Sequence, residues 1–108
     1  MESRSQEAEM NVVEIPLLAG NQVFDIQLGG IAYRMRIQYR GVAGWVLDIM
    51  HPNSEPMVLG TPLVSGVDIL ESYQSLGFNG ALVFVCKDGN ETSGEGLGDT
   101  KRLYFLSS

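Results

Sequence analysis

Hydrophobic and polar residues alternate most regularly over positions 31–40 of the chain. A period of two is typical of a β-strand that buries one face and exposes the other to solvent. We therefore expect a strand whose odd-numbered side chains enter the core. The expected core residues are Ile31, Tyr33, Met35, Ile37 and Tyr39, and the expected solvent-facing residues are Ala32, Arg34, Arg36, Gln38 and Arg40.

Two flanking segments show the same alternation, at residues 23–28 and 45–50. Gly29-Gly30 separates the first from the central strand, and two glycines between alternating runs predict a tight hairpin. A second turn is expected at 41–44. The three strands should therefore form an antiparallel meander. Its inward residues outside the central strand are Phe24, Ile26, Leu28, Trp45, Leu47 and Ile49.

The first apolar run extends from Val12 to Leu18 and contains Pro16. Because proline cannot donate to a strand ladder, this run should lie at a sheet edge or end at the proline. Residues 57–59 predict a short strand, which we expect Gly60-Thr61-Pro62 to break.

The C-terminal third predicts two more strands. Residues 81–86 form a continuous β-branched and aromatic run, which is typical of a strand covered on both faces. Residues 103–106 predict the last strand, and the glycine-rich and acidic residues 88–100 predict a long exposed loop.

One short helix is expected near residues 66–76. Ser65 is a candidate N-cap, and Asp68 lies where a helix dipole favours an acid. Gly77 should end the helix. The apolar side of this helix, formed by Val67, Leu70 and Tyr73, should pack on the sheet.

These elements predict a mainly β, β-rich α+β fold. We expect about six to seven antiparallel strands in a small barrel or sandwich. The length of 108 residues fits one domain, assigned to 12–108, preceded by a flexible arm at 1–11.

Composition and charge narrow the functional class. Thirteen acids against seven bases give a net charge of −6, which argues against nucleic-acid binding through phosphate contacts. No run approaches the about 20 apolar residues of a membrane span. Charged residues make up only 19% of the chain, which fits a subunit buried in an assembly and equally a glycine-rich β-protein. The single cysteine, Cys86, is expected to be a structural thiol.

The candidate chemistry is sparse. His51 is the only histidine and stands before a proline in a turn, without a nucleophile motif around it. The acidic loop does not have the ligand spacing of an EF-hand. We therefore expect no catalytic residue, no metal site and no cofactor, and we predict that the chain is not an enzyme.

Two groups of charged residues are candidate partner contacts. The basic group lies on the polar face of the central strand, where it could bind an acidic partner or simply form the solvent face of the sheet. The acidic group lies in the predicted loop. The candidates are Arg34, Arg36, Arg40, Asp88, Glu91, Glu95 and Asp99.

The order of several short segments adds information beyond their chemistry. These segments are Glu14-Ile15-Pro16-Leu17, Phe24 with Ile26, Leu28-Gly29-Gly30, Tyr33, Arg36, Gly44-Trp45-Val46-Leu47-Asp48, Gly60-Thr61-Pro62-Leu63-Val64-Ser65-Gly66 with Asp68 and Leu70, Leu76-Gly77-Phe78-Asn79-Gly80-Ala81-Leu82, and Leu103-Tyr104-Phe105. In this order the chain resembles the baseplate plug family of contractile-tailed phages over residues 12–106.

The resemblance implies a structural component of the virion, assembled in the host cytoplasm. It implies a plug seated on the tail axis against the central hub, in contact with neighbouring tail proteins and forming a homo-oligomer, with three-fold symmetry favoured. It supplies no catalytic residue. The alternatives are a stand-alone ligand- or peptide-binding β-module in the host cytoplasm and, more weakly, a small hydrolase.

Overall fold

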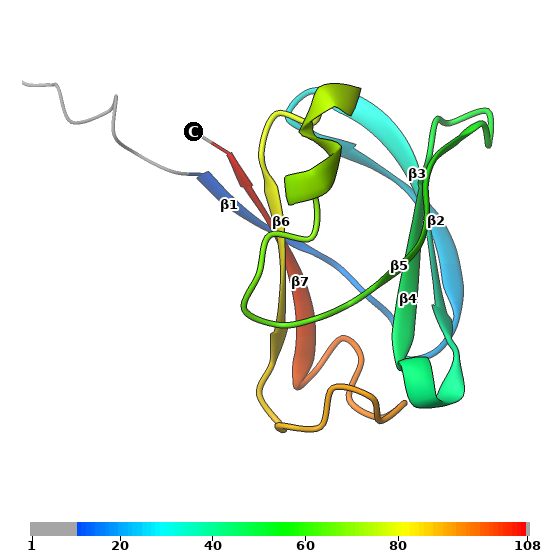
Figure 1. Cartoon of the computed structure of the whole chain (residues 1–108), viewed down its shortest axis with the longest axis vertical. Helices are drawn as coiled ribbons and strands as arrows, with labels where there is room; N and C mark the ends of the chain where they lie inside the picture. The colour runs from blue at the N-terminus through cyan, green and yellow to red at the C-terminus, as the bar shows by residue number, and fades with distance from the viewer. Residues whose placement is uncertain (1–10, 108) are drawn as a thin grey trace, which may run out of the picture.

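The structure is a computed structural model that describes residues 11–107. Residues 1–10 of the predicted arm lie outside the described residues. Seven strands form two antiparallel sheets that face each other (Figure 1). Their bounds are β1 (Asn11–Ile15), β2 (Gln22–Leu28), β3 (Ile31–Tyr39), β4 (Trp45–Met50), β5 (Pro56–Pro62), β6 (Ala81–Cys86) and β7 (Lys101–Ser107).

The sheets have unequal width. The three-stranded sheet has the order β1-β7-β6, and the four-stranded sheet has the order β2-β3-β4-β5. The second sheet is the predicted meander extended by β5. Neither sheet closes on itself, so the fold is a sandwich and not a barrel, and the predicted mainly β class is confirmed.

The hairpin and the edge proline are confirmed. Gly29 and Gly30 have φ values of 60° and 84°, and they join β2 to β3 with Leu28 paired to Ile31. Both glycines are required because this turn needs positive φ at two successive positions. Strand β1 ends at Ile15, directly before Pro16, and lies at the edge of its sheet.

The predicted strand phases are also confirmed in the centre of the meander. Each of the six predicted core residues there is no more than 3% exposed: Tyr33, Met35, Ile37, Trp45, Leu47 and Ile49. Leu82, Phe84, Leu103 and Phe105 face them from the other sheet within the same core cluster. Burial of each aliphatic side chain stabilises the fold by about 1.5–3 kcal/mol.

The ends of β3 depart from the expected burial. Ile31 and Tyr39 have the inward phase but are 42% and 40% exposed, and they are the first and last residues of the strand. On the polar face, Arg34, Arg36 and Gln38 are half-buried rather than exposed. Their long side chains lie across the sheet surface instead of projecting into solvent.

The predicted helix at 66–76 is wrong in type and length. Only a 3-10 helix, η3 (Glu71–Leu76), is present, and Tyr73 inside it has a non-helical φ of −120°. Asp68 explains the difference, because its Oδ1 atom accepts the N–H groups of Leu70 and Leu82 at 2.9 and 3.0 Å. This carboxylate ties the segment to β6 instead of capping a helix. Gly77 ends the element as predicted, with φ of 92°.

The predicted break at Gly60 is also wrong, because β5 continues to Pro62 through an irregular stretch. Gly60 has φ of 72°, and its N–H group donates to Oδ1 of Asp48 at 2.7 Å. A side-chain acceptor thus replaces the ladder bond that the irregular register removes.

Strand β6 is covered fully on only one face. Leu82 and Phe84 are completely buried, whereas Val83 and Val85 are half-buried, so the expected burial of both faces is wrong for one face. The loop after β6 is mostly exposed as predicted, but Leu97 inserts into the core.

Candidate interaction surfaces

The arginine face of β3 is largely paired within the chain. The guanidinium of Arg34 donates from Nε to Oδ1 of Asp25 at 2.8 Å and from a terminal nitrogen to Oδ2 at 3.3 Å. The other terminal nitrogen donates to Oγ of Ser54 at 2.9 Å. The Arg34 hydrogen bond holds the pKa of Asp25 below its usual range, and the pKa of Arg34 is raised in return. Such two-point pairs fix geometry as well as charge.

Arg36 forms the second pair of this face. Its Nε donates to Oδ2 of Asp48 at 2.8 Å, and Asp48 is only 5% exposed. Oδ1 of the same carboxylate accepts the N–H of Gly60, so both oxygens are satisfied. Asp48 was not predicted from the sequence, although its pairing with Arg36 in the antiparallel register was a usable signal.

Arg40 differs from the other two arginines. Its terminal nitrogen donates to Oε1 of Gln38 at 2.9 Å, so its partner among residues 11–107 is a neutral amide. Arg40 is exposed at the end of β3, beside the 3-10 turn η2 (Gly41–Ala43). The charge of this arginine is therefore the most accessible of the three.

Two acids of the loop anchor it to the sandwich. Asp88 accepts hydrogen bonds from the Cys86 thiol at 3.0 Å, Lys101 Nζ at 2.8 Å and Thr100 Oγ1 at 2.6 Å, and these hold its pKa well below the usual range. Glu91 accepts the N–H and hydroxyl groups of Ser65 at 3.0 and 2.9 Å.

The other two acids of the loop bond through their backbone. The Glu95 carbonyl accepts Lys101 Nζ at 2.7 Å, and the Asp99 carbonyl accepts Arg102 Nε at 2.8 Å. Both residues are exposed. Their carboxylates are therefore available to a partner, whereas those of Asp88 and Glu91 are engaged in holding the loop.

Lys101 is a second functional residue that was not predicted from the sequence. It is completely buried, and its ammonium is satisfied by Asp88 and by the Glu95 carbonyl. The available signal was its phase, because Lys101 shares the inward face of β7 with Leu103 and Phe105.

The fold brings Arg40 and the acidic loop to the same end of the sandwich. The Tyr39 hydroxyl donates to the Thr92 carbonyl at 2.8 Å, and Gly44 approaches Thr92 closely. Figure 1 shows the loop beside the η2 turn at this end. Arg34 instead contacts Ser54, in the turn at the other end of β4. The seven candidate residues therefore do not form one cluster.

The groups with potential chemistry are separate from one another. His51 is exposed in the turn before β5, where its N–H donates to the Glu55 carbonyl. Cys86 is half-buried, and burial together with the Asp88 hydrogen bond raises the pKa of its thiol. Residues 11–107 contain no group of three or more His, Cys, Asp or Glu side chains placed to hold a metal.

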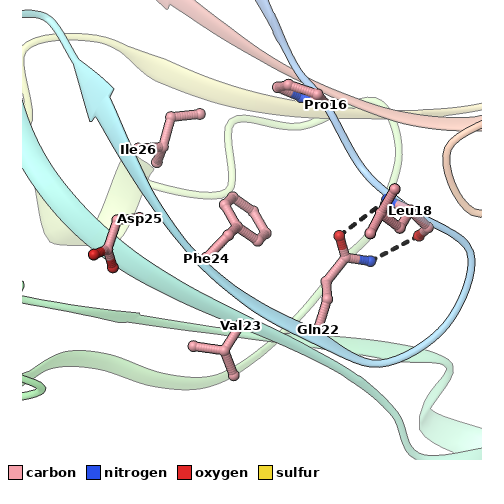
Figure 2. Close-up of a pocket in the computed structure, with 7 residues that line it drawn as sticks. All are labelled: Pro16, Leu18, Gln22, Val23, Phe24, Asp25 and Ile26. Atoms are coloured by element: carbon pink, nitrogen blue, oxygen red, sulfur yellow. Dashed lines mark hydrogen bonds between the residues drawn. The ribbon is translucent and has the colours of Figure 1, made fainter.

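An apolar groove of about 320 Å³ lies where the chain crosses from β1 to β2. Figure 2 shows Phe24 and Ile26 pointing toward the Pro16–Leu18 segment, whereas Val23 and Asp25 point away. This groove was not predicted from the sequence. In the described part of the chain, no helix has the length and apolar character required to cross a membrane.

A narrow β-sandwich with internally paired charges, exposed strand edges and an apolar groove has the features of a small interaction domain. Residues 12–108 match a protein family described as cyanophage baseplate Pam3 plug gp18. The chain belongs to this family, and membership identifies it as a structural component of a phage baseplate and hence of the virion tail. No individually curated protein shows significant similarity to the sequence.

Proposed function

We propose that the chain is a plug that seats on the tail axis against the central hub of a contractile tail and helps to close the baseplate end of the tube. Membership of the baseplate plug family is the observation that carries this proposal. The plug acts through an interface and not through a reaction, in keeping with a family of structural proteins.

The surface chemistry supports such a role. Arg34 and Arg36 are neutralised within the chain, so the middle of the outer face can be covered without leaving unpaired charges. The accessible charges, Arg40, Glu95 and Asp99, lie toward the loop end of the sandwich. Charged groups of this kind fix the register of a contact. All seven predicted contact residues remain candidates, and these three would form the polar rim of the contact surface.

The size of the molecule makes even one contact extensive. The accessible surface is 6056 Å², and a standard interface of about 800 Å² per partner would cover roughly an eighth of it. Contacts with the hub and with copies of the chain around the axis would cover more. We propose a homo-oligomer with the three-fold symmetry of the hub, assembled in the host cytoplasm before incorporation into the tail.

A second candidate function is a stand-alone peptide-binding β-module in the host cytoplasm. The groove beside β2 favours it, because apolar grooves along strand edges bind extended peptides. Because the chain is a baseplate component, this alternative would apply only to copies of the chain that do not enter particles.

Depletion of the chain separates the two functions. Tails are assembled from a phage whose gene for this chain carries an amber codon, in hosts with and without the suppressor. The proposed function predicts that tails lacking the chain have an open axial channel at the baseplate, and that the suppressor host restores closure. Tails that lack the chain but show the same density on the axis as complete tails would contradict the proposed function.

A further inference from the structure

Strand β2 has one edge that no strand of the described chain occupies, because β2 is outermost in the order β2-β3-β4-β5. The Gly29-Gly30 hairpin determines which backbone groups face this edge. In a two-residue hairpin the residues that flank the turn form a hydrogen-bonded pair, and every second pair is hydrogen-bonded thereafter. The N–H and C=O groups of Val23, Asp25 and Gln27 therefore point away from β3.

Bonds on β3 agree with this alternation. Arg40, in phase with the even-numbered residues of β3, donates its N–H toward β4, to the Gly44 carbonyl at 2.7 Å. Tyr39 donates its N–H toward the β2 side, to Oδ1 of Asn21 at 2.9 Å. The odd-numbered residues of β3 thus bond to the even-numbered residues of β2, which leaves the odd-numbered residues of β2 facing outward.

The inner face of this edge is only partly covered. Phe24 and Ile26 are half-buried, whereas Met35 and Ile37 on the neighbouring strand are completely buried. The difference follows from the unequal sheets, because three strands cannot cover four. The uncovered space is the groove of about 320 Å³ (Figure 2). Residues 22–26 of β2, with Phe24 and Ile26 pointing inward, line one side, and Pro16 and Leu18 line the other.

The opposite wall is held in place by one side chain. Gln22 donates from Nε2 to the carbonyls of Leu18 and Gly20 at 2.7 and 2.8 Å, and its Oε1 accepts the Leu18 N–H at 3.0 Å. Figure 2 shows the two Leu18 bonds. Because the wall is fixed before a partner arrives, binding in the groove requires little ordering of the chain.

We propose that the open edge of β2 accepts an extended segment of another baseplate protein as an added strand. This inference rests on the proposed baseplate role and names the kind of partner contact. The segment places apolar side chains at every second position into the groove, while its backbone bonds to Val23, Asp25 and Gln27. Its other face carries neutral or basic residues, because the chain has a net charge of −6.

The first ten residues of a second copy do not fit this description. They contain Glu2, Glu7 and Glu9, and their alternating apolar residues are limited to Ala8 and Met10. An acidic segment would also be repelled by the net negative charge of the chain. The occupant is therefore a segment of a different protein.

Amide hydrogen exchange at single-residue resolution tests the proposal, with isolated baseplates as the probe. Exchange is compared between the free chain and the chain within the baseplates. The Val23, Asp25 and Gln27 amides should exchange about tenfold or more slowly in the baseplates. The Gly77 amide, which bonds to the Gln74 carbonyl at the exposed end of η3 and lies outside the proposed contact surfaces, serves as an internal reference for general protection. Unchanged exchange at all three β2 amides in baseplates that contain the chain would overturn the inference while leaving the baseplate role intact.

A pair of variants at one position gives an independent test. Val23→Pro removes an N–H that faces the open edge, whereas Val23→Thr retains both this donor and the β-branched shape. Thermal unfolding first establishes that both variants fold. Val23→Pro should enter baseplates at about a tenth of the wild-type level or less, and Val23→Thr at the wild-type level. Equal incorporation of the two folded variants would overturn the inference. A dimer of the free chain that Val23→Pro abolishes would also overturn it, because the edge of β2 would then bind a second copy of the chain.

Discussion

The Nζ atom of Lys101 lies 2.8 Å from Oδ2 of Asp88, although the lysine side chain is completely buried. A buried ammonium is tolerated only when it is paired and hydrogen-bonded, and the Glu95 carbonyl supplies the second bond at 2.7 Å. Lys101 is the first residue of β7, and its side chain therefore links the loop to this strand. The acidic loop is an anchored part of the sandwich and can present Glu95 and Asp99 in a defined arrangement.

Lys101→Ala should destabilise the fold by about 3 kcal/mol, because it removes the partner of a carboxylate and leaves space inside the core. Lys87→Ala is the matched control, since Lys87 is exposed and should change stability by no more than about 0.5 kcal/mol. Urea unfolding measures both values. Equal stability of the two variants would show that the Lys101–Asp88 pair is not structural.

The stability of the fold should decrease in acid. The folded-state pKa of Asp88 lies well below its ordinary value of 3.8, and that of Asp25 is also lowered. Their contribution is therefore present above the unfolded pKa and is lost as the pH falls below about 4. Urea unfolding between pH 7 and pH 3 should show this decrease, and Asp88→Asn should weaken the pH dependence. A variant with an unchanged pH profile would contradict the assignment.

How far the sequence predicts the fold depends on the origin of each feature. The meander, the edge strand that ends at Pro16 and the Gly29-Gly30 hairpin follow from local patterns, and they are present as expected. Asp48 was not identified as buried, because the period-two pattern places it on the polar face of its strand. Lys101 was not identified either, because the predicted last strand began only at residue 103. Their partners become visible only when strands pair or a loop folds back.

Tertiary contacts also explain the other departures. Asp68 has the position of an acid in a first helical turn, but it accepts the N–H of Leu82 on β6 and so favours an extended path. The groove beside β2 results from the difference in width between the two sheets, which no single segment encodes. The unpredicted features of the candidate surfaces thus arise from long-range pairing and not from local propensity.

Cys86 should be dispensable for assembly. Its thiol is half-buried with a raised pKa, so it is mostly protonated at neutral pH and reacts slowly. Cys86→Ser should enter tails at the wild-type level, and wild-type tails should yield only monomeric chain in non-reducing electrophoresis. A covalent oligomer that disappears in Cys86→Ser would refute the structural assignment.

Arg40→Glu should impair incorporation into the baseplate, because it reverses the most accessible charge of the arginine face without breaking an internal ion pair among the described residues. Lys87→Glu makes the same charge change at another exposed position. We expect purified tails to contain about tenfold less of the Arg40→Glu variant than of the Lys87→Glu variant. This ratio corresponds to a loss of about 1.4 kcal/mol in binding free energy. Equal amounts would remove Arg40 from the proposed contact surface.

The position of the chain in the assembled tail tests the central claim most directly. Electron cryomicroscopy of tails should show the sandwich on the tail axis in contact with the hub, in copies that follow its three-fold symmetry. The two sheets and the loop between β6 and β7 provide the features that identify the density. A map with the chain at the periphery of the baseplate, or tails that contain none of it, would contradict the plug function.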